Sequence, residues 1–187
     1  TLNPPSNFDT NYQHDYNGGG WIESLEALVT EKNELDLGIS FFSDSIEEKK
    51  IIGRKSYFPI YLQPAKKNIF SFIKKRWLGF QGDEFKINDI LNVVDEFNPD
   101  VIHVFGTERV FARIQEHTNI PLVIHIQGII NPYKNAFLPP FFSKIDFKYG
   151  FNNFLNFLLG RNPLQQFKSF QKRVTREEKI LSDAKYV

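Results

Sequence analysis

Short apolar runs that alternate with amphipathic segments are the feature that most constrains the fold of this chain. Such runs occupy residues 35–43, 57–63, 101–105 and 121–128, and each has the length and the β-branched and aromatic content of a strand. The runs at 101–105 and 121–128 are typical of parallel strands that are covered on both faces. The alternation therefore predicts a doubly wound α/β domain with a mainly parallel sheet and flanking helices.

Apolar residues at helical spacing predict the helices between these strands. The helix after the glycines at 18–20 has an apolar face made of Ile22, Leu25, Ala27, Leu28 and Val29. A second helix carries Ile87, Ile90, Leu91, Val94 and Phe97 and stops at Asn98-Pro99. A short helix is expected at 107–119. Two more are expected at about 147–159 and at 163–183, the latter with Leu164, Phe167, Phe170, Val174 and Leu181.

Two further local signals concern the sheet. Pro59 places the run at 57–63 at an edge or an irregular position, because proline cannot donate a ladder hydrogen bond. The last three residues, 185–187, have the character of another strand.

Composition and charge exclude several classes of function. The 187 residues carry a net charge of +1, so no overall field favours nucleic acid or a membrane surface. The absence of Cys excludes disulfides and thiol-based metal sites, and it fits a reducing compartment such as the cytoplasm. No apolar run approaches the roughly 20 residues that span a bilayer. The chain has no Met and no secretory signal at its start, so we expect a fragment or an excised domain.

Three successive glycines, Gly18, Gly19 and Gly20, stand directly before the first expected helix. Glycine has no Cβ, so its backbone N–H can approach a ligand closely. A helix N-terminus adds unpaired N–H donors and partial positive charge, and together these favour an anion, usually a phosphate. The glycines match neither GxGxxG nor a P-loop, and a simple turn or close helix–strand packing stays an equal alternative.

The loops that follow the strands at 101–105 and 121–128 are the other candidate site. Ligands of open α/β sheets bind outside the carboxyl ends of the strands. These two loops offer mainly neutral hydrogen-bonding groups, which suit polyols and sugars better than a metal: Thr107, Glu108, Gln127, Asn131 and Tyr133, with Gly106 and Gly128. His103 and His125 lie inside the strands, where a hydrogen-bonded core histidine is the favoured interpretation. No pair of histidines has metal-ligand spacing.

Two segments raise the question of a membrane. Residues 65–80 contain Lys66, Lys67, Lys74, Lys75 and Arg76 with no acid between them, a pattern shared by interfacial helices and by ordinary surface helices. The surface helix is the favoured interpretation. The aromatic stretch at 137–159 has three alternative interpretations: the lining of an acceptor cleft, a membrane contact or an interface with a further domain.

Four segments resemble a known family when they are taken together. "GGGWIESL", "NPDVIHVFGTE", "IPLVIHIQGIINPY" and "REEKILSDAKYV" occur in this order over about residues 3–187. They are similar to the N-terminal half of retaining GT-B glycosyltransferases of bacterial surface-polysaccharide synthesis, which carry a four-type N-terminal glycosyltransferase domain. In that family two Rossmann-like domains face each other across a cleft. The N-terminal domain mostly binds the acceptor, and the C-terminal domain holds most of the nucleotide sugar.

The resemblance implies a domain assignment and substrates. Residues 1–187 would be one acceptor-side domain, truncated at both ends and inactive without the C-terminal donor domain. The substrates would be a nucleoside diphosphate sugar and a glycan or lipid-linked acceptor, with no metal or other cofactor and no nucleic acid. The implied location is the cytoplasm, and peripheral contact with the inner face of the plasma membrane is left open.

The resemblance also implies roles for particular residues. Gly18, Gly19 and Gly20 would bind the donor phosphate, and the acceptor side would be lined by Glu108, Gln127, Gly128 and Asn131. In many relatives a histidine follows the strand that corresponds to "VIHIQG". Gln127 stands at that place, and glutamine cannot act as a general base, so no catalytic residue is assigned.

Two other functions remain from the residues themselves. One is a non-enzymatic Rossmann-like module that holds a phosphorylated ligand or a protein partner. The other is a nicotinamide-dependent oxidoreductase, which is the weakest because the fingerprint would need a glycine where Glu23 stands. No acid is well placed to hold a ribose, since Asp36 belongs to an expected strand.

Overall fold

The computed structural model describes residues 8, 20–31, 34–63, 83–126, 128–134, 136–137, 140–141 and 163–187, without the side chains of 20–23 and 163–164. The chain forms two compact units with mixed α/β structure, and each is described by itself. Unit 1 consists of Thr1–Pro64 and Asn88–Pro99, and unit 2 consists of Ala65–Ile87 and Asp100–Val187. The basic segment at 65–80 and the helix expected at 147–159 lie outside the described residues.

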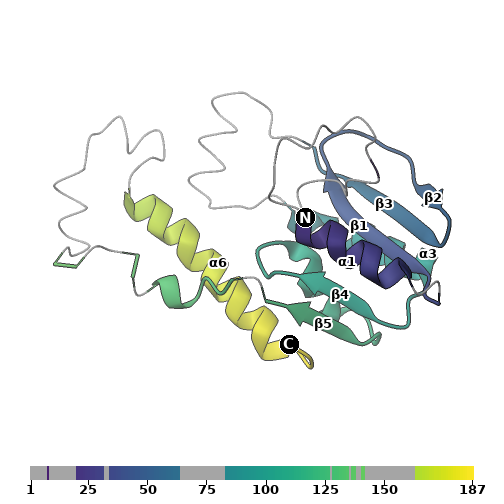
Figure 1. Ribbon diagram of the computed structural model, residues 1–187. Helices are drawn as coiled ribbons and strands as arrows, with labels where there is room; N and C mark the ends of the chain where they lie inside the picture. The colour runs from purple at the N-terminus through teal and green to yellow at the C-terminus, as the bar shows by residue number, and fades with distance from the viewer. Residues whose placement is uncertain are drawn as a thin grey trace. The chain divides into compact units, whose positions relative to one another are not determined.

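Unit 1 contains a three-stranded sheet in the order β1-β3-β2 (Figure 1). Strand β1 (Leu37–Ser43) pairs in parallel with β3 (Lys55–Tyr61), and β2 (Lys50–Ile52) pairs antiparallel with β3. A two-residue turn joins β2 to β3, and Gly53 adopts the positive φ of 61° that this turn requires. Strand β2 was missing from the sequence prediction because it is only three residues long.

The two faces of this sheet are covered by different helices. Tyr57 on β3 donates a hydrogen bond to Glu26 of α1 (Gly20–Glu31). The next residue, Phe58, points to the opposite face and packs edge-on against Phe97 of α3 (Ile87–Phe97). Helices α1 and α3 therefore contact opposite faces of the sheet.

The core of unit 1 lies on both of these faces. On the α1 face, Phe8, Phe41 and Tyr57 form a buried aromatic cluster, with the Phe8 and Phe41 rings 5.0 Å apart. On the α3 face, Gly38 leaves room for Phe97, because a Cβ there would lie 2.9 Å from that ring. Helix α3 ends where the sequence predicts, since Asn98 has a φ of 51° and Pro99 follows it.

The prediction for Pro59 holds locally, although β3 as a whole is not an edge strand. Pro59 predicts an edge or an irregular position, but β3 lies between β1 and β2. The proline is tolerated because β2 pairs only with residues 55–57, so Pro59 faces no β2 partner. Its missing N–H is therefore not needed on that side of the strand.

Unit 2 contains a parallel pair, β4 (Ile102–Phe105) and β5 (Leu122–His125). They are connected through η3 (Val110–Glu116), which is a 3-10 helix where the sequence predicted a short helix of unspecified type. One face of the pair is buried and carries Val104, Leu122 and Ile124. The chain end adds a short parallel bridge, because Tyr186 pairs with Val123, which supports the strand character expected at 185–187.

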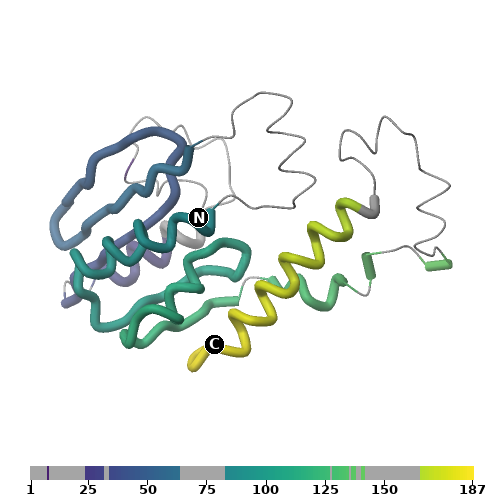
Figure 2. The backbone as a smooth tube through the Cα atoms, turned by 180° about the vertical axis from the view of Figure 1, so that it is seen from behind, coloured from purple at the N-terminus to yellow at the C-terminus, as the bar shows by residue number. Residues whose placement is uncertain are grey.

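The long helix α6 (Pro163–Asp183) packs against η3 and against η4 (Pro132–Lys134). Figures 1 and 2 show it running past these elements toward the C-terminus beside β5. Phe167 and Val174, both expected on its apolar face, are buried, together with Ile180. The helix begins and ends at the predicted residues.

The apolar face predicted for α1 is wrong in its centre. Leu28 is 64% exposed, and Ala27 is exposed as well. The buried residue at this turn is Glu26, which is 5% exposed. It is buried because Tyr57 and Lys55 both donate hydrogen bonds to its carboxylate, at 2.6 and 2.9 Å.

Candidate functional site at the carboxyl ends of β4 and β5

The loop after β4 begins with a tight turn at Gly106. Its amide continues the parallel ladder by donating to the carbonyl of His125 at 2.9 Å. Gly106 then has a φ of 78°, and a Cβ built on it would overlap Oε2 of Glu108. This position needs glycine for its backbone conformation, and the turn places Thr107 immediately beyond the strand.

A single buried carboxylate ties this loop to the loop that follows β5. Glu177 of α6 is 1% exposed, and its Oε2 accepts a hydrogen bond from the Thr107 hydroxyl at 2.7 Å. The same carboxylate accepts from the backbone amides of Ile130 at 3.2 Å and Asn131 at 2.8 Å. These three bonds satisfy a charge that would otherwise be costly to bury. The two loops are therefore held at one edge of the β4–β5 pair.

The residues predicted for the acceptor side differ in exposure and in contacts at this edge of the β4–β5 pair. Asn131 is held through its backbone by Glu177 and is only partly exposed. Gly128 is exposed, and a Cβ there would meet nothing within 4 Å. Glu108 is partly buried, with its carboxylate folded back toward Gly106. Gln127 lies outside the described residues.

The predicted phosphate loop is described only at its last residue. Gly20 is the first residue of α1, so the helix begins one residue earlier than the sequence prediction, within the glycine triplet. Gly18 and Gly19 lie outside the described residues.

The two strand histidines are not core residues, which corrects the sequence interpretation. The side chains of His103 and His125 are both exposed, and they share one face of the β4–β5 pair with Phe105. The His103 and His125 rings are 5.7 Å apart, and the Phe105 ring is 4.3 Å from that of His103. Partial burial lowers the pKa of His103, and the neighbouring charge of His125 lowers it further. The strands were expected to be covered on both faces, but this face carries polar rings.

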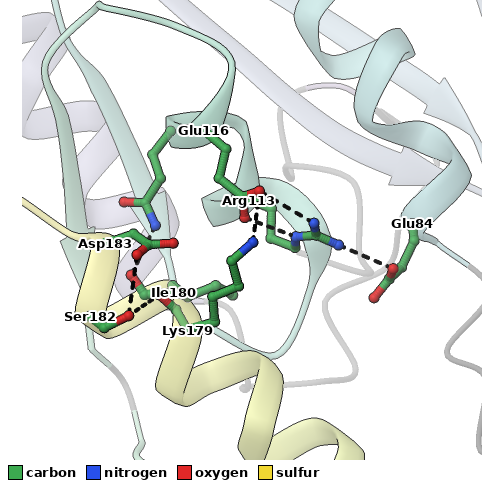
Figure 3. Close-up of polar contacts among 8 residues, drawn as sticks. Glu84, Arg113, Glu116, Lys179, Ile180, Ser182 and Asp183 are labelled. Carbon is green, nitrogen blue, oxygen red and sulfur yellow. Dashed lines mark hydrogen bonds and ion pairs between the residues drawn. The ribbon is translucent and has the colours of Figure 1, made fainter.

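A charged network joins α6 to η3. Figure 3 shows Arg113 between Glu84 and Glu116. Its guanidinium lies 3.1 Å from the Glu84 carboxylate and 3.3 Å from that of Glu116. Lys179 of α6 reaches Glu116 at 3.0 Å. The hydrogen bond from Arg113 is the main cause that lowers the pKa of Glu116. This network fastens the C-terminal half of α6 to η3, together with a bond from Gln115 to the carbonyl of Ile180.

A second charged group surrounds Asp83, which is fully buried. Arg109 lies 3.6 Å and Arg176 lies 3.5 Å from its two carboxylate oxygens. Arg176 also donates to the backbone carbonyl of Glu108, so this group borders the loop after β4. Burial lowers the pKa of the Arg176 guanidinium, Asp83 and Glu84 oppose this, and the nearby Arg173 and Arg109 lower it again.

Sequence reasoning missed Glu177, Asp83 and the arginines around it. The sequence contained one signal for Glu177. The apolar stripe of α6 runs from Val174 to Ile180 and Leu181, and the acid Glu177 lies between them. A charge on the buried stripe of a helix indicates a polar partner in the core. The partners themselves come from loops about 46 to 70 residues away in the sequence, so spacing alone does not reveal them.

The described residues contain neither a cluster of metal ligands nor a helix suited to a membrane. No group of three or more His, Asp or Glu side chains among them is placed to hold a metal ion. None of the helices in the described ranges has both the length and the apolar character needed to cross a bilayer.

Comparison with known proteins gave no relatives. No family model, no curated protein and no solved structure matches this chain.

Proposed function

We propose that this chain is the acceptor-side half of a retaining GT-B glycosyltransferase, which moves a sugar from a nucleoside diphosphate sugar to a glycan or lipid-linked acceptor. In the transfer, the bond between the anomeric carbon and the diphosphate oxygen breaks. A bond from that carbon to an acceptor hydroxyl oxygen forms, and the hydroxyl proton passes to the departing diphosphate. The proposal combines the family resemblance with the geometry of the β4–β5 edge.

The observation that carries the proposal is the Glu177 tie between the two strand-end loops. It fixes Thr107 and the backbone at Ile130 and Asn131 at the edge where open α/β sheets bind ligands. Gly128 lies in the same loop with open space beside it. A fixed loop with an uncrowded backbone suits a polyhydroxylated ligand, because few side chains have to be ordered when it binds.

The donor side of the proposal rests on the glycines before α1. Charge develops on the leaving diphosphate during transfer, and backbone N–H groups at a helix start stabilise such charge without a metal. In this proposal Gly18, Gly19 and Gly20 supply those groups, and most other donor contacts come from a second domain.

The test uses the full-length protein with UDP- and GDP-sugars and a panel of glycan acceptors. Acceptor-dependent release of nucleotide is the expected result. Gly128→Val should raise the KM for the acceptor without changing the melting temperature, because the new side chain fills open space that the acceptor needs. Ala136→Val is the matched control, since Ala136 is also exposed and lies on the neighbouring turn.

Two results would contradict this proposal. Unchanged acceptor KM in Gly128→Val would remove the loop after β5 from the acceptor site. Absence of nucleotide release with every donor and acceptor, combined with tight binding of a phosphorylated ligand, would favour the non-enzymatic binding module.

A further inference from the structure

The near-neutral charge of the chain conceals two oppositely charged units. Unit 2 contains 18 Lys and Arg against 9 Asp and Glu, a net charge of +9. Unit 1 contains 5 Lys and Arg against 13 Asp and Glu, a net charge of −8. The expectation that no field favours an anionic partner therefore does not hold for unit 2, where an anion is attracted by the unit's own charge.

Three of these positive charges lie together beside Asp83. Arg173 and Arg176 lie three residues apart on α6, so they share a face of the helix. Arg109 contributes a third guanidinium, and Asp83 is the carboxylate between Arg109 and Arg176. Arginine stays protonated in proteins, so three positive charges face the buried carboxylate of Asp83, while the nearby carboxylate of Glu84 is paired with Arg113.

Several donors in this group have no acceptor. The Nε atoms of Arg173 and Arg176 are both buried and have no hydrogen-bond partner. The side chain of Arg176 as a whole is only 9% exposed. The contacts to Asp83 are long, at 3.5 and 3.6 Å, and its Oδ2 has no hydrogen-bond partner either. Long contacts of this kind use little of the bonding capacity of a guanidinium, which prefers short bidentate pairs with an oxyanion.

The missing negative charge is not available from the remaining sequence of unit 2. Residues 65–82 contain five Lys and Arg and no acid, and residues 138–162 contain three Lys and Arg against Asp146 alone. A ligand is therefore a better source of acceptor oxygens than the rest of this unit. Arg109 and Arg173 are the accessible members, since the side chain of Arg109 is 28% exposed and Arg173 is partly exposed.

We propose that Arg109, Arg173 and Arg176 form a binding site for a phosphate or diphosphate group. The group sits on the guanidinium N–H donors of Arg109 and Arg173, and Arg176 supports it from the buried side. Asp83 holds Arg109 and Arg176 in place. Its negative charge leaves two of the three positive charges of the arginines uncompensated, and one phosphate group neutralises these. The site does not depend on the transferase proposal, because it rests on charge and geometry within unit 2.

The test is calorimetric titration of the full chain with inorganic pyrophosphate and with inorganic phosphate. Binding to the unaltered chain is expected, with pyrophosphate the tighter ligand. Arg173→Gln should weaken pyrophosphate binding by about tenfold, the effect of losing one charge-assisted contact. Lys168→Gln removes the same charge from an exposed position of the same helix and should change the affinity by less than about twofold.

Two further variants keep the test independent of folding. Arg173→Lys keeps the charge but loses the planar fork, so an intermediate loss is expected. Arg109→Gln should also weaken binding, and because it leaves the buried Asp83 with Arg176 alone, its melting temperature is measured alongside and a decrease is expected. The proposal is overturned if pyrophosphate does not bind to the unaltered chain. It is equally overturned if Lys168→Gln weakens binding as much as Arg173→Gln, since only bulk charge would then matter.

Vesicles distinguish the source of the phosphate. Flotation is measured with phosphatidylcholine vesicles, with and without phosphatidic acid. Binding that needs phosphatidic acid and is displaced by pyrophosphate supports the site and assigns it to a lipid headgroup. Binding of pyrophosphate without any vesicle binding supports the site and assigns it to a soluble phosphate compound.

Discussion

Gly106 and Gly128 show that glycine serves two different purposes at the same edge of unit 2. Gly106 has a positive φ and sits under the carboxylate of Glu108, so the backbone itself demands glycine. Gly128 has open space around its Cβ position and no such demand. From sequence the two were indistinguishable, because both follow a strand at the start of a loop.

The difference predicts opposite outcomes for the same substitution. Gly106→Ala should destabilise the chain by about 1–2 kcal/mol, mostly through left-handed backbone strain, because the Glu108 carboxylate can move aside. Gly128→Ala should change stability by less than about 0.5 kcal/mol. Urea unfolding of the two variants measures both values, and equal midpoints would contradict this account of Gly106.

A second prediction at this scale concerns pH. The folded state lowers the pKa of His103 below its ordinary value of 6.5, so below pH 6.5 the unfolded chain binds the proton more readily. The contribution of His103 to stability should therefore fall as the pH drops through 6.5 toward the folded pKa. His103→Gln should lose less stability than the unaltered chain between about pH 7 and pH 5.

Unfolding free energies at several pH values test this, with His117→Gln as the control. His117 is also exposed but lies after η3, away from the ring cluster. An identical pH dependence in the unaltered chain and in His103→Gln would show that the ring cluster does not affect protonation.

At the scale of elements, periodicity predicted most of the helices and strands, and tertiary partners decided the rest. The helix at 163–183 and the end of α3 at Asn98 are confirmed, because local spacing and chain punctuation determine them. The exposure of Leu28 and the burial of Glu26 were not predictable, because Tyr57 and Lys55 come from a strand about 30 residues further on. The candidate site follows the same rule: its loops were predictable, but the Glu177 carboxylate that joins them was not.

Glu177 gives the clearest prediction about an element. Glu177→Gln removes the negative charge and replaces an acceptor with a donor that faces other donors, so a loss of about 3 kcal/mol is expected. Amide hydrogen exchange at Ile130 and Asn131 should accelerate together, because both amides lose the same acceptor.

Glu178→Gln is the matched control, since Glu178 is the next residue on α6 and is exposed. Its effect should be less than about 0.5 kcal/mol. If Glu177→Gln left exchange at Ile130 and Asn131 unchanged, the tie between the two loops would have to be abandoned.

At the scale of the whole molecule, the two units differ more in charge than in architecture. Both combine a small parallel pairing with helices, as the alternation in the sequence predicts. Their charges of −8 and +9 could not be anticipated from the total, because the unit boundaries divide the chain at places that the sequence does not mark. The segment 88–99 joins the acidic unit, whereas 65–87 joins the basic one.

This division of charge has a practical consequence for anyone who handles the protein. An isoelectric point of 7.8 suggests weak retention on any ion-exchange resin near neutral pH. Because resins contact local patches rather than the average, the chain should instead adhere to sulfonate beads through its basic half and to quaternary-amine beads through its acidic half, in the same buffer.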